Sequence, residues 1–370
     1  MPDGVIDRWF FKCRKCGENY DLNSFKHRCQ CGGLFGLAPE DDGILNLEPS
    51  ISLGEVVTPL IKAGEREIYY KLDYYHPTGS FKDRGARVLI SLLKYMGIKK
   101  IKEDSSGNAG AAIAAYAAAA EIDCKIFVPA SASGGKIRQI EAYGAGVEKI
   151  EGSREKVHDV ALSREKGRYY ASHIYNPLFF AGVSTLVQEL INQLPGPDEL
   201  DRGSIIVPVG NGTFLLGLTR GLKEAGLNPQ IIAVQSEDCC PVFNEFYSSS
   251  SQEAGGNDIT KKDRTMPESK ENSGCGRNSG KKPAEGIMIE DPPRLEGIIS
   301  AVRNFSGSVI KVSDLEINHA LSELHKKGIY VESTAAAAPA ALKKIEENKS
   351  MDLSSPVIIP LTGSGLKEGW

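Results

Sequence analysis

Short apolar runs alternate with longer segments of helical spacing along most of the chain. Glycine, proline and charged residues bound the apolar runs, which is typical of buried strands. We expect strands at residues 67–72, 99–104, 125–129, 147–150, 204–209, 231–235 and 357–361, and helices at 86–95, 109–120, 134–143 and 217–225. A strand followed by a helix, repeated many times, is the pattern of parallel sheets covered by helices. The sequence therefore predicts an α/β protein with open parallel sheets.

One tract interrupts this alternation. Residues 247–284 are rich in serine, glycine, asparagine, lysine and glutamate, with almost no large apolar side chains. Such a segment cannot offset its ordering entropy by burying apolar surface. Because strand patterns resume after it, we interpret the tract as a mobile low-complexity insertion that splits one α/β domain.

The composition is that of an ordinary globular protein. Of 370 residues, 41% are apolar and 25% are charged, and the net charge is −4. This balance gives no support for nucleic acid or an anionic membrane as a partner. The first eleven residues lack the layout of a signal peptide, and the apolar run at 109–120 is too short to span a bilayer. We therefore expect a cytoplasmic protein.

Four of the eight cysteines lie close together near the N-terminus. Cys13, Cys16, Cys29 and Cys31 form a Cys-x2-Cys pair and a Cys-x-Cys pair beside glycines that allow tight turns. Facing thiolate pairs of this kind suit tetrahedral zinc, and a filled set of four ligands leaves no position open for catalysis. The cysteines predict a zinc ribbon with structural zinc. The alternatives are a ribbon without metal or free thiols, with His27 as a competing ligand.

A single lysine stands in a turn-forming run before the first predicted helix. Lys82 lies in Pro-Thr-Gly-Ser-Phe-Lys-Asp-Arg-Gly at 77–85. A turn that leads into a helix holds such a side chain at a fixed angle. The amine can form a Schiff base with a carbonyl cofactor if its surroundings favour the neutral form. The alternative is a solvated lysine at a helix start.

Two other turns join a strand to a helix. Residues 105–110 (Ser-Ser-Gly-Asn-Ala-Gly) precede the alanine-rich helix, and their backbone N–H groups suit an anion such as a carboxylate. Residues 210–213 (Gly-Asn-Gly-Thr) offer flexible backbone and exposed amides that suit a phosphate. The second turn is no dinucleotide fingerprint, because Leu215 stands where that motif requires glycine. Taken alone, it is equally consistent with a structural turn.

Together these motifs resemble the pyridoxal-phosphate enzymes of the tryptophan synthase β-subunit superfamily, and threonine synthase most closely within it. The resemblance covers roughly residues 50–246 and 285–370, and some threonine synthases also carry an N-terminal zinc ribbon. The motifs that carry it are 79–84, 105–108, 208–213 and 361–367 (Leu-Thr-Gly-Ser-Gly-Leu-Lys). The resemblance implies two α/β domains with the cofactor in the cleft between them, and a homodimer.

The resemblance also implies a role for each motif. Lys82 would bind the cofactor as a Schiff base and then move protons at the substrate carbons. Asn108 would bond the ring hydroxyl, and Gly210, Asn211, Gly212 and Thr213 would hold the phosphate. Thr362 would face the pyridine nitrogen, where a hydroxyl favours elimination and replacement over transamination; the alternative is an ordinary strand-end threonine.

On the substrate side, Ser105, Ser106 and Ala109 would bind the α-carboxylate. Lys136 matches a family lysine near the substrate; the alternative is a surface lysine at a helix start. Glu332 and Ser333 lie in a turn that such enzymes place near the cofactor, although helix capping explains them equally well.

The sequence departs from threonine synthases at two positions. Phe179 stands where their Asn-Pro-x-Arg segment has an arginine that helps bind the substrate phosphate. Loss of that partner costs on the order of 2–5 kcal/mol of binding if charge is left unpaired. Ala109 stands where threonine is common.

We therefore expect an enzyme that converts O-phospho-L-homoserine and water to L-threonine and phosphate. The alternatives are a threonine or serine dehydratase, a β-replacement enzyme acting on O-phosphoserine, or a non-catalytic binding protein. The expected domains are a zinc ribbon at 1–40, a large domain at 41–85 and 186–370 that contains the insertion, and a small domain at 86–185.

Overall fold

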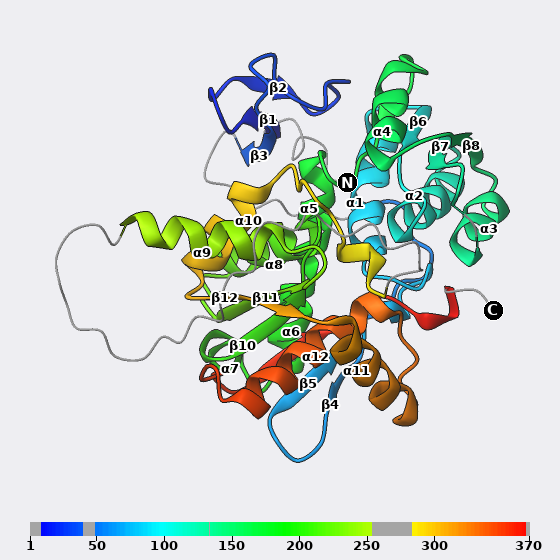
Figure 1. The fold of residues 1–370 in the computed structure, drawn as a ribbon. Helices are drawn as coiled ribbons and strands as arrows, with labels where there is room; N and C mark the ends of the chain where they lie inside the picture. The colour runs from blue at the N-terminus through cyan, green and yellow to red at the C-terminus, as the bar shows by residue number, and fades with distance from the viewer. Residues whose placement is uncertain (1–8, 40–48, 133, 254–282, 368–370) are drawn as a thin grey trace.

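A computed structural model describes residues 9–39, 49–132, 134–253 and 283–367 of the chain. It contains three sheets, two of them covered by helices (Figure 1). The α/β organisation with parallel sheets is confirmed. Within the described ranges, no helix is both long and apolar enough to cross a membrane.

The larger sheet has six strands, and five of them are parallel. In spatial order they are β12 (Ser308–Val312), β11 (Gln230–Ser236), β10 (Ser204–Pro208), β13 (Val357–Pro360), β5 (Ile68–Lys71) and β4 (Leu60–Lys62). The inner strands are runs of isoleucine and valine buried on both faces, as expected for a parallel sheet between helical layers. Strand β4, which the sequence did not predict, pairs antiparallel with β5 at the edge.

The smaller sheet has four parallel strands in the order β8 (Gly146–Ile150), β7 (Asp123–Pro129), β6 (Lys100–Glu103) and β9 (Tyr169–Tyr170). Its helices are α2 (Asn108–Ala119), α3 (Gly135–Ala142) and α4 (Arg154–Ser163). The alanines of α2 up to Ala117 are buried, because this helix packs against β7, α1 and α3 at once. Small side chains allow that close approach.

Helix α1 (Lys82–Tyr95) joins the two helical layers, because it packs against α2 and against α5 (Pro177–Val183). Two glycines make the contact with α5 possible. A Cβ on Gly85 would lie 2.1 Å from the Phe179 ring, and one on Gly182 would lie 2.1 Å from the Arg84 carbonyl oxygen. The first turns of α1, where Lys82 lies, are therefore packed closely against α5.

The remaining helices are α6 (Thr185–Gln193), α7 (Pro197–Arg202), α8 (Thr213–Glu224), α9 (Pro241–Glu253), α10 (Leu295–Asn304), α11 (Asp314–Lys326) and α12 (Ser333–Asn348), with short 3₁₀ turns η1 (Asp73–Tyr75), η2 (Glu285–Ile287) and η3 (Gly365–Lys367). Helix α9 includes residues 247–253, so the first part of the predicted insertion is helical. Residues 254–282 of that insertion lie outside the described residues.

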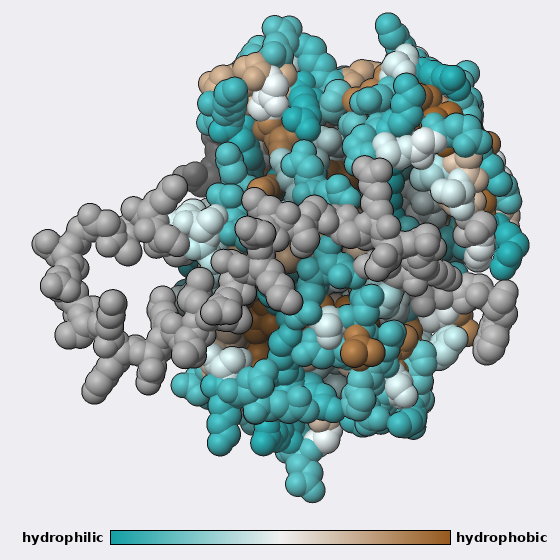
Figure 2. All heavy atoms as spheres, viewed as in Figure 1, coloured by the Kyte–Doolittle hydropathy of each residue, from teal (hydrophilic) through white to brown (hydrophobic). Residues whose placement is uncertain are grey.

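The N-terminal sheet is small and antiparallel, in the order β2 (Asn19–Asp21), β1 (Trp9–Cys13) and β3 (Phe35–Pro39). It lies at the top of the view in Figure 1. Phe11 and Phe35 stack with ring centroids 5.7 Å apart and form its core. On the face of the molecule seen in Figure 2, hydrophilic residues predominate and hydrophobic ones show mainly in recesses.

A buried ion cluster fixes the segment around Lys82. The Arg84 guanidinium donates to both carboxylate oxygens of Asp73 at 2.9 and 2.8 Å and to both of Glu189 at 2.6 and 2.9 Å. Lys71 Nζ also pairs with Glu189, at 2.5 Å. Burial by itself would raise the pKa of Asp73, but the charge and hydrogen bonds of Arg84, with the charges of His76 and Lys71, together lower it to about 2. The cluster joins α1 to β5, η1 and α6.

We expect Arg84→Met to destabilise the fold by about 3–5 kcal/mol, because it leaves the buried Asp73 carboxylate without its partner. Urea unfolding measures the change. Arg202→Ala is the control, since Arg202 pairs with Glu199 on the surface and its loss should cost less than about 1 kcal/mol. Similar values for the two variants would show that the buried cluster does not anchor this region.

Candidate functional site

Three predicted motifs follow three neighbouring strands of the larger sheet. Lys82 comes after β5, Thr362 after β13, and residues 210–213 after β10. Because these strands are parallel neighbours, their carboxyl ends meet at one edge of the sheet. That edge is where open α/β sheets bind ligands. The topology therefore brings together segments that are far apart in sequence.

The turn before Lys82 is bonded directly to the Thr362 segment. Phe81 N–H donates to the Thr362 carbonyl at 3.0 Å, and Ser364 N–H donates to the Gly79 carbonyl at 2.9 Å. Gly79 has φ +79°, a left-handed conformation that favours glycine. These bonds fix the Lys82 backbone next to residues 362–364.

The Lys82 amine lies in surroundings that favour its neutral form. Burial lowers its pKa to about 8, opposed chiefly by the carboxylate of Glu332. Within the described part of the chain the amine has no ion-pair partner, and Nζ lies 4.3 Å from the centroid of the Phe81 ring. A substantial neutral fraction near physiological pH is what a nucleophilic lysine needs.

Residues 210–213 form a tight turn at the N-terminus of α8. Gly212 has φ +77°, and a Cβ on Gly210 would lie 2.9 Å from Ile287 Cα. The ring of Phe214 meets that of Phe81 edge-on with centroids 4.8 Å apart, which places this turn beside the Lys82 turn. The free N–H groups of a helix N-terminus suit a phosphate.

The fourth motif comes from the smaller sheet. Ser105 and Ser106, both half-buried, follow β6 and lead into α2, which begins at Asn108 with Ala109 buried behind it. A Cβ on Gly110 would lie 1.9 Å from the Ser105 carbonyl oxygen, so only glycine allows this turn to close. The Asn108 side-chain oxygen is buried without a hydrogen-bond partner among the described residues.

Glu332 connects the two sheets across the site. Its carboxylate accepts from Asn108 Nδ2 at 2.8 Å and from Lys136 Nζ at 2.9 Å. It stands at the N-cap of α12 but makes no side-chain capping bond. Burial would raise the pKa of Glu332, yet the charges of Lys136 and Lys367 outweigh burial and lower it. Capping, one interpretation of the sequence, therefore does not explain this side chain.

Three further charged or titratable residues lie at the candidate site, and none of them has a role predicted from the sequence. Lys367 in η3 has a buried Nζ without a hydrogen-bond partner in the described ranges, and its side chain lies against Gly79. Glu103 and His173 form a buried pair, and both residues lie within electrostatic range of Lys82. Two consecutive acidic residues at the end of a predicted strand, directly before the turn at 105–110, were the available signal for Glu103.

Phe179 lies away from any ligand-accessible surface. Its side chain is fully buried between α1 and α5, against Gly85. An arginine at this position in the present packing would be a buried charge. The phenylalanine thus contributes to the core beneath Lys82, and replacing it by arginine is no simple way to add a phosphate ligand.

The four N-terminal cysteines converge. The sulfur atoms of Cys13, Cys16, Cys29 and Cys31 all lie within 4.8 Å of one another. Cys13 and Cys31 are 3.5 Å apart, as are Cys16 and Cys29. His27 is not part of the group; its ring lies against Tyr175 and His158 instead. Four thiol ligands at this spacing suit a tetrahedral metal ion.

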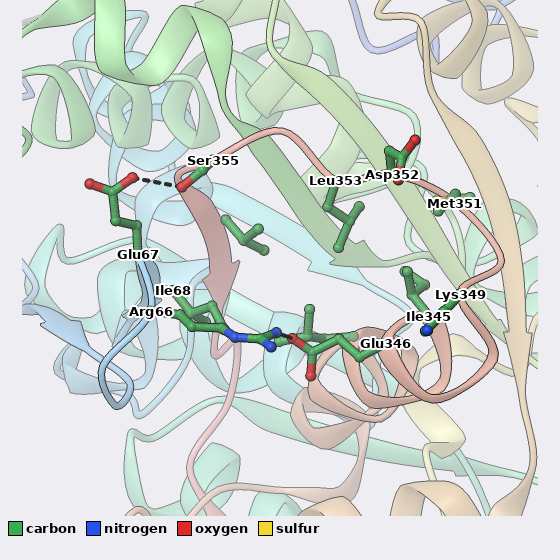
Figure 3. A pocket seen from close by; sticks show the side chains of 12 residues that line it. Arg66, Glu67, Ile68, Ile345, Glu346, Lys349, Met351, Asp352, Leu353 and Ser355 are labelled. Atoms are coloured by element: carbon green, nitrogen blue, oxygen red, sulfur yellow. Dashed lines mark hydrogen bonds and ion pairs between the residues drawn. The ribbon is translucent and has the colours of Figure 1, made fainter.

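A separate cavity of about 370 Å³ lies at the opposite edge of the larger sheet, where β5 and β13 begin. Figure 3 shows its wall, in which Arg66 pairs with Glu346 and Ser355 bonds Glu67. It contains none of the predicted site residues. The cavity therefore lies apart from the candidate site.

Solved structures share this architecture. Maize serine racemase superposes with a TM-score of 0.67 at 23% identity, covering 84% of this chain and 89% of that one. Threonine deaminase isoform 2 of Solanum lycopersicum gives a TM-score of 0.63 at 20% identity, with 84% and 79% covered. At these identities the likeness concerns the fold.

Sequence comparison places the chain in a family. A threonine synthase of Methanocaldococcus jannaschii is 28% identical over 403 residues, covering 96% of this chain and 92% of that protein. A threonine synthase of Halalkalibacterium halodurans is 29% identical over 336 residues, with 86% and 85% covered. The sequence model of one family, described as "Pyridoxal-phosphate dependent enzyme", matches residues 51–363. The chain belongs to this family of pyridoxal-phosphate dependent enzymes.

Proposed function

We propose that this enzyme is a threonine synthase-like lyase, which converts O-phospho-L-homoserine and water to L-threonine and phosphate. The observation that carries the proposal is a half-buried Lys82 with a lowered pKa at the meeting point of three strand ends. Curated relatives that match 96% of the chain are named threonine synthase, which supports this member of the family. The reaction would serve threonine biosynthesis.

The residues present fit pyridoxal phosphate. Lys82 offers an amine for its aldehyde, and the unpartnered buried oxygen of Asn108 offers a bond to its ring hydroxyl. Gly210, Asn211, Gly212 and Thr213 would hold its phosphate at the start of α8, and Thr362 would face the ring nitrogen. When bound, the cofactor supplies an electron sink for charge that develops on the substrate carbons.

The smaller sheet would hold the substrate. The turn with Ser105, Ser106 and Ala109 presents backbone N–H groups to the α-carboxylate. Lys136 lies opposite, paired with Glu332, and can exchange that partner for an anionic group of the substrate. Lys82 would hold and release the proton at the α- and β-carbons, since a pKa of about 8 suits both directions of transfer.

One observation bears on the alternative functions. Phe179 is buried in the core, so no arginine reaches the substrate from this position. A dehydratase of threonine or serine, or a β-replacement enzyme using O-phosphoserine, needs no such arginine. This alternative shares the cofactor and Lys82 with the first and differs in the substrate and the product.

We also propose that the cysteine cluster binds structural zinc as a zinc ribbon. The convergence of four thiols, with a Cβ on Gly33 only 2.5 Å from Cys13 Sγ, supports a closed metal centre that only glycine can accommodate. Three further points stay predictions. They are the division into a large domain at 41–85 and 186–370 and a small domain at 86–185, the homodimer, and the cytoplasmic location. The division is supported by the separate sheets that these ranges supply.

The paired activity assay tests the substrate. We expect the holoenzyme to release phosphate and threonine in equal amounts from O-phospho-L-homoserine, and to form little 2-oxoacid from L-threonine or L-serine. Oxoacid without threonine formation would instead establish the dehydratase. Activity with O-phosphoserine and an added nucleophile would establish the replacement enzyme.

The pH dependence of cofactor attachment tests Lys82. Since only the neutral amine attacks an aldehyde, the rate at which visible absorbance appears on adding pyridoxal phosphate to apoenzyme should rise with pH and level off above about 8. Lys82→Ala should give no covalent product, whereas Lys94→Ala, on the exposed face of α1, should behave as wild type. A midpoint near about 10, the ordinary lysine value, would contradict the burial effect.

Metal analysis tests the ribbon. We expect about one zinc ion per chain, lost in Cys16→Ser because three ligands hold zinc poorly, and retained in Cys240→Ser, which lies outside the cluster. Chelation should lower the melting temperature with little effect on the rate of the folded enzyme. Wild-type protein without bound metal and with unchanged stability in chelator would reject the zinc ribbon.

A further inference from the structure

Two acidic residues end strand β6 and have different partners. Asp104 accepts from Tyr170 Oη at 2.6 Å and lies 2.9 Å from His158 Nδ1. Glu103 is fully buried, and its Oε1 lies 2.6 Å from His173 Nδ1. Asp104 directly follows the last residue of β6, and the two carboxyl groups have different partners. The Glu103 carboxyl group lies within electrostatic range of Lys82.

His173 lies among the segments that form the candidate site. It belongs to the connection between β9 and α5, and its carbonyl accepts from Thr213 Oγ1 at 3.2 Å. Its ring is bonded to the end of β6, two residues before Ser105, and the charge of Lys82 acts on it. His173 is therefore held between the turn at 210–213, which would bind the cofactor phosphate, and strand β6, which leads to the turn at 105–110.

The state of the pair follows from its surroundings. Burial and the nearby Asp104 carboxylate raise the pKa of Glu103, and its Oε2 is buried without a partner among the described residues. Burial and the charge of Lys82 lower the pKa of His173 to about 3. Both effects favour a neutral carboxylic acid beside a neutral imidazole. The acid then donates to Nδ1, so the ring hydrogen is on Nε2.

The outer nitrogen of the ring is available to a ligand. Nε2 has no hydrogen-bond partner in the described part of the chain, and the His173 side chain keeps 11% of its surface exposed. If the Glu103 proton moved to Nδ1, Nε2 would still carry its hydrogen. The site thus contains a hydrogen-bond donor close to Lys82 that none of the proposed roles uses.

We propose that His173, with Glu103 behind it, donates a proton to the oxygen that leaves the substrate. The inference rests on the proposed function. As the bond between the γ-carbon and the ester oxygen breaks, its electron pair stays on the oxygen, which takes the Nε2 proton. The Glu103 proton moves to Nδ1, and one proton from solvent restores the pair. His173 is then a catalytic residue and Glu103 a positioning residue.

The test compares two substrates in the holoenzyme with His173→Asn. O-phospho-L-homoserine must lose its oxygen, whereas L-vinylglycine has the same carbon chain with no leaving oxygen. We expect turnover of the first to fall by roughly 10²–10⁴-fold, the range for loss of a general acid, and turnover of the second to stay within about threefold. Equal losses for both substrates, or no loss for either, would overturn the proposal.

Glu103→Gln provides a second variant that keeps the size and hydrogen bonding of the side chain but has no proton to give. It should also slow O-phospho-L-homoserine selectively, with unchanged melting temperature and cofactor absorbance. Asp104→Asn is the matched control at the next residue, which pairs with His158 and Tyr170 instead, and it should not separate the two substrates. If only Asp104→Asn slowed O-phospho-L-homoserine selectively, the role assigned to His173 and Glu103 would be wrong.

The outcome for wild-type enzyme separates this inference from the proposed function. Absence of phosphate release from O-phospho-L-homoserine would reject the function. The same variants would then be compared on L-serine and β-chloro-L-alanine, whose chloride leaves without a proton. Selective loss of L-serine turnover would support His173 as the donor, and parallel loss would overturn it.

Discussion

The position of Lys82 depends on a buried charge two residues away. Arg84 is surrounded by Asp73, Glu189 and Thr58, which come from three separate segments, and its bonds fix the first turn of α1 against η1 and α6. A buried guanidinium is tolerated when both carboxylates neutralise it, whereas any one of these charges buried without its partner would destabilise the fold. The nucleophilic lysine is thus carried by a segment that cannot shift without breaking this cluster.

Glu332 provides the second constraint, because it links the two sheets through Asn108 and Lys136. The C-terminal segment reinforces the link: a Cβ on Gly79 would touch the Lys367 side chain, and one on Gly135 would lie 2.6 Å from its carbonyl oxygen. In Figure 1 this red segment lies between the larger sheet and α3. The sheets therefore meet through a few polar groups that also face the proposed cofactor.

The sequence predicted the strands and turns well where local pattern determines them. The isoleucine and valine runs of β10, β11 and β13 appear where expected, as does the turn before α2. Pattern could not reveal strand order, because neighbouring strands such as β5 and β13 are far apart in the chain. For the same reason Glu103, His173 and Lys367 had no predicted role, and Phe179 was interpreted without knowledge of its burial. The surroundings of these four residues are set by tertiary contacts, which local sequence pattern does not reveal.

The central claim is that Lys82 alone carries the cofactor. Reduction of the holoenzyme with borohydride, followed by peptide mass spectrometry, tests it directly, because reduction makes the lysine–cofactor link permanent. The account predicts a phosphopyridoxyl group on Lys82. The same group on Lys136 or Lys367, with Lys82 unmodified, would contradict it.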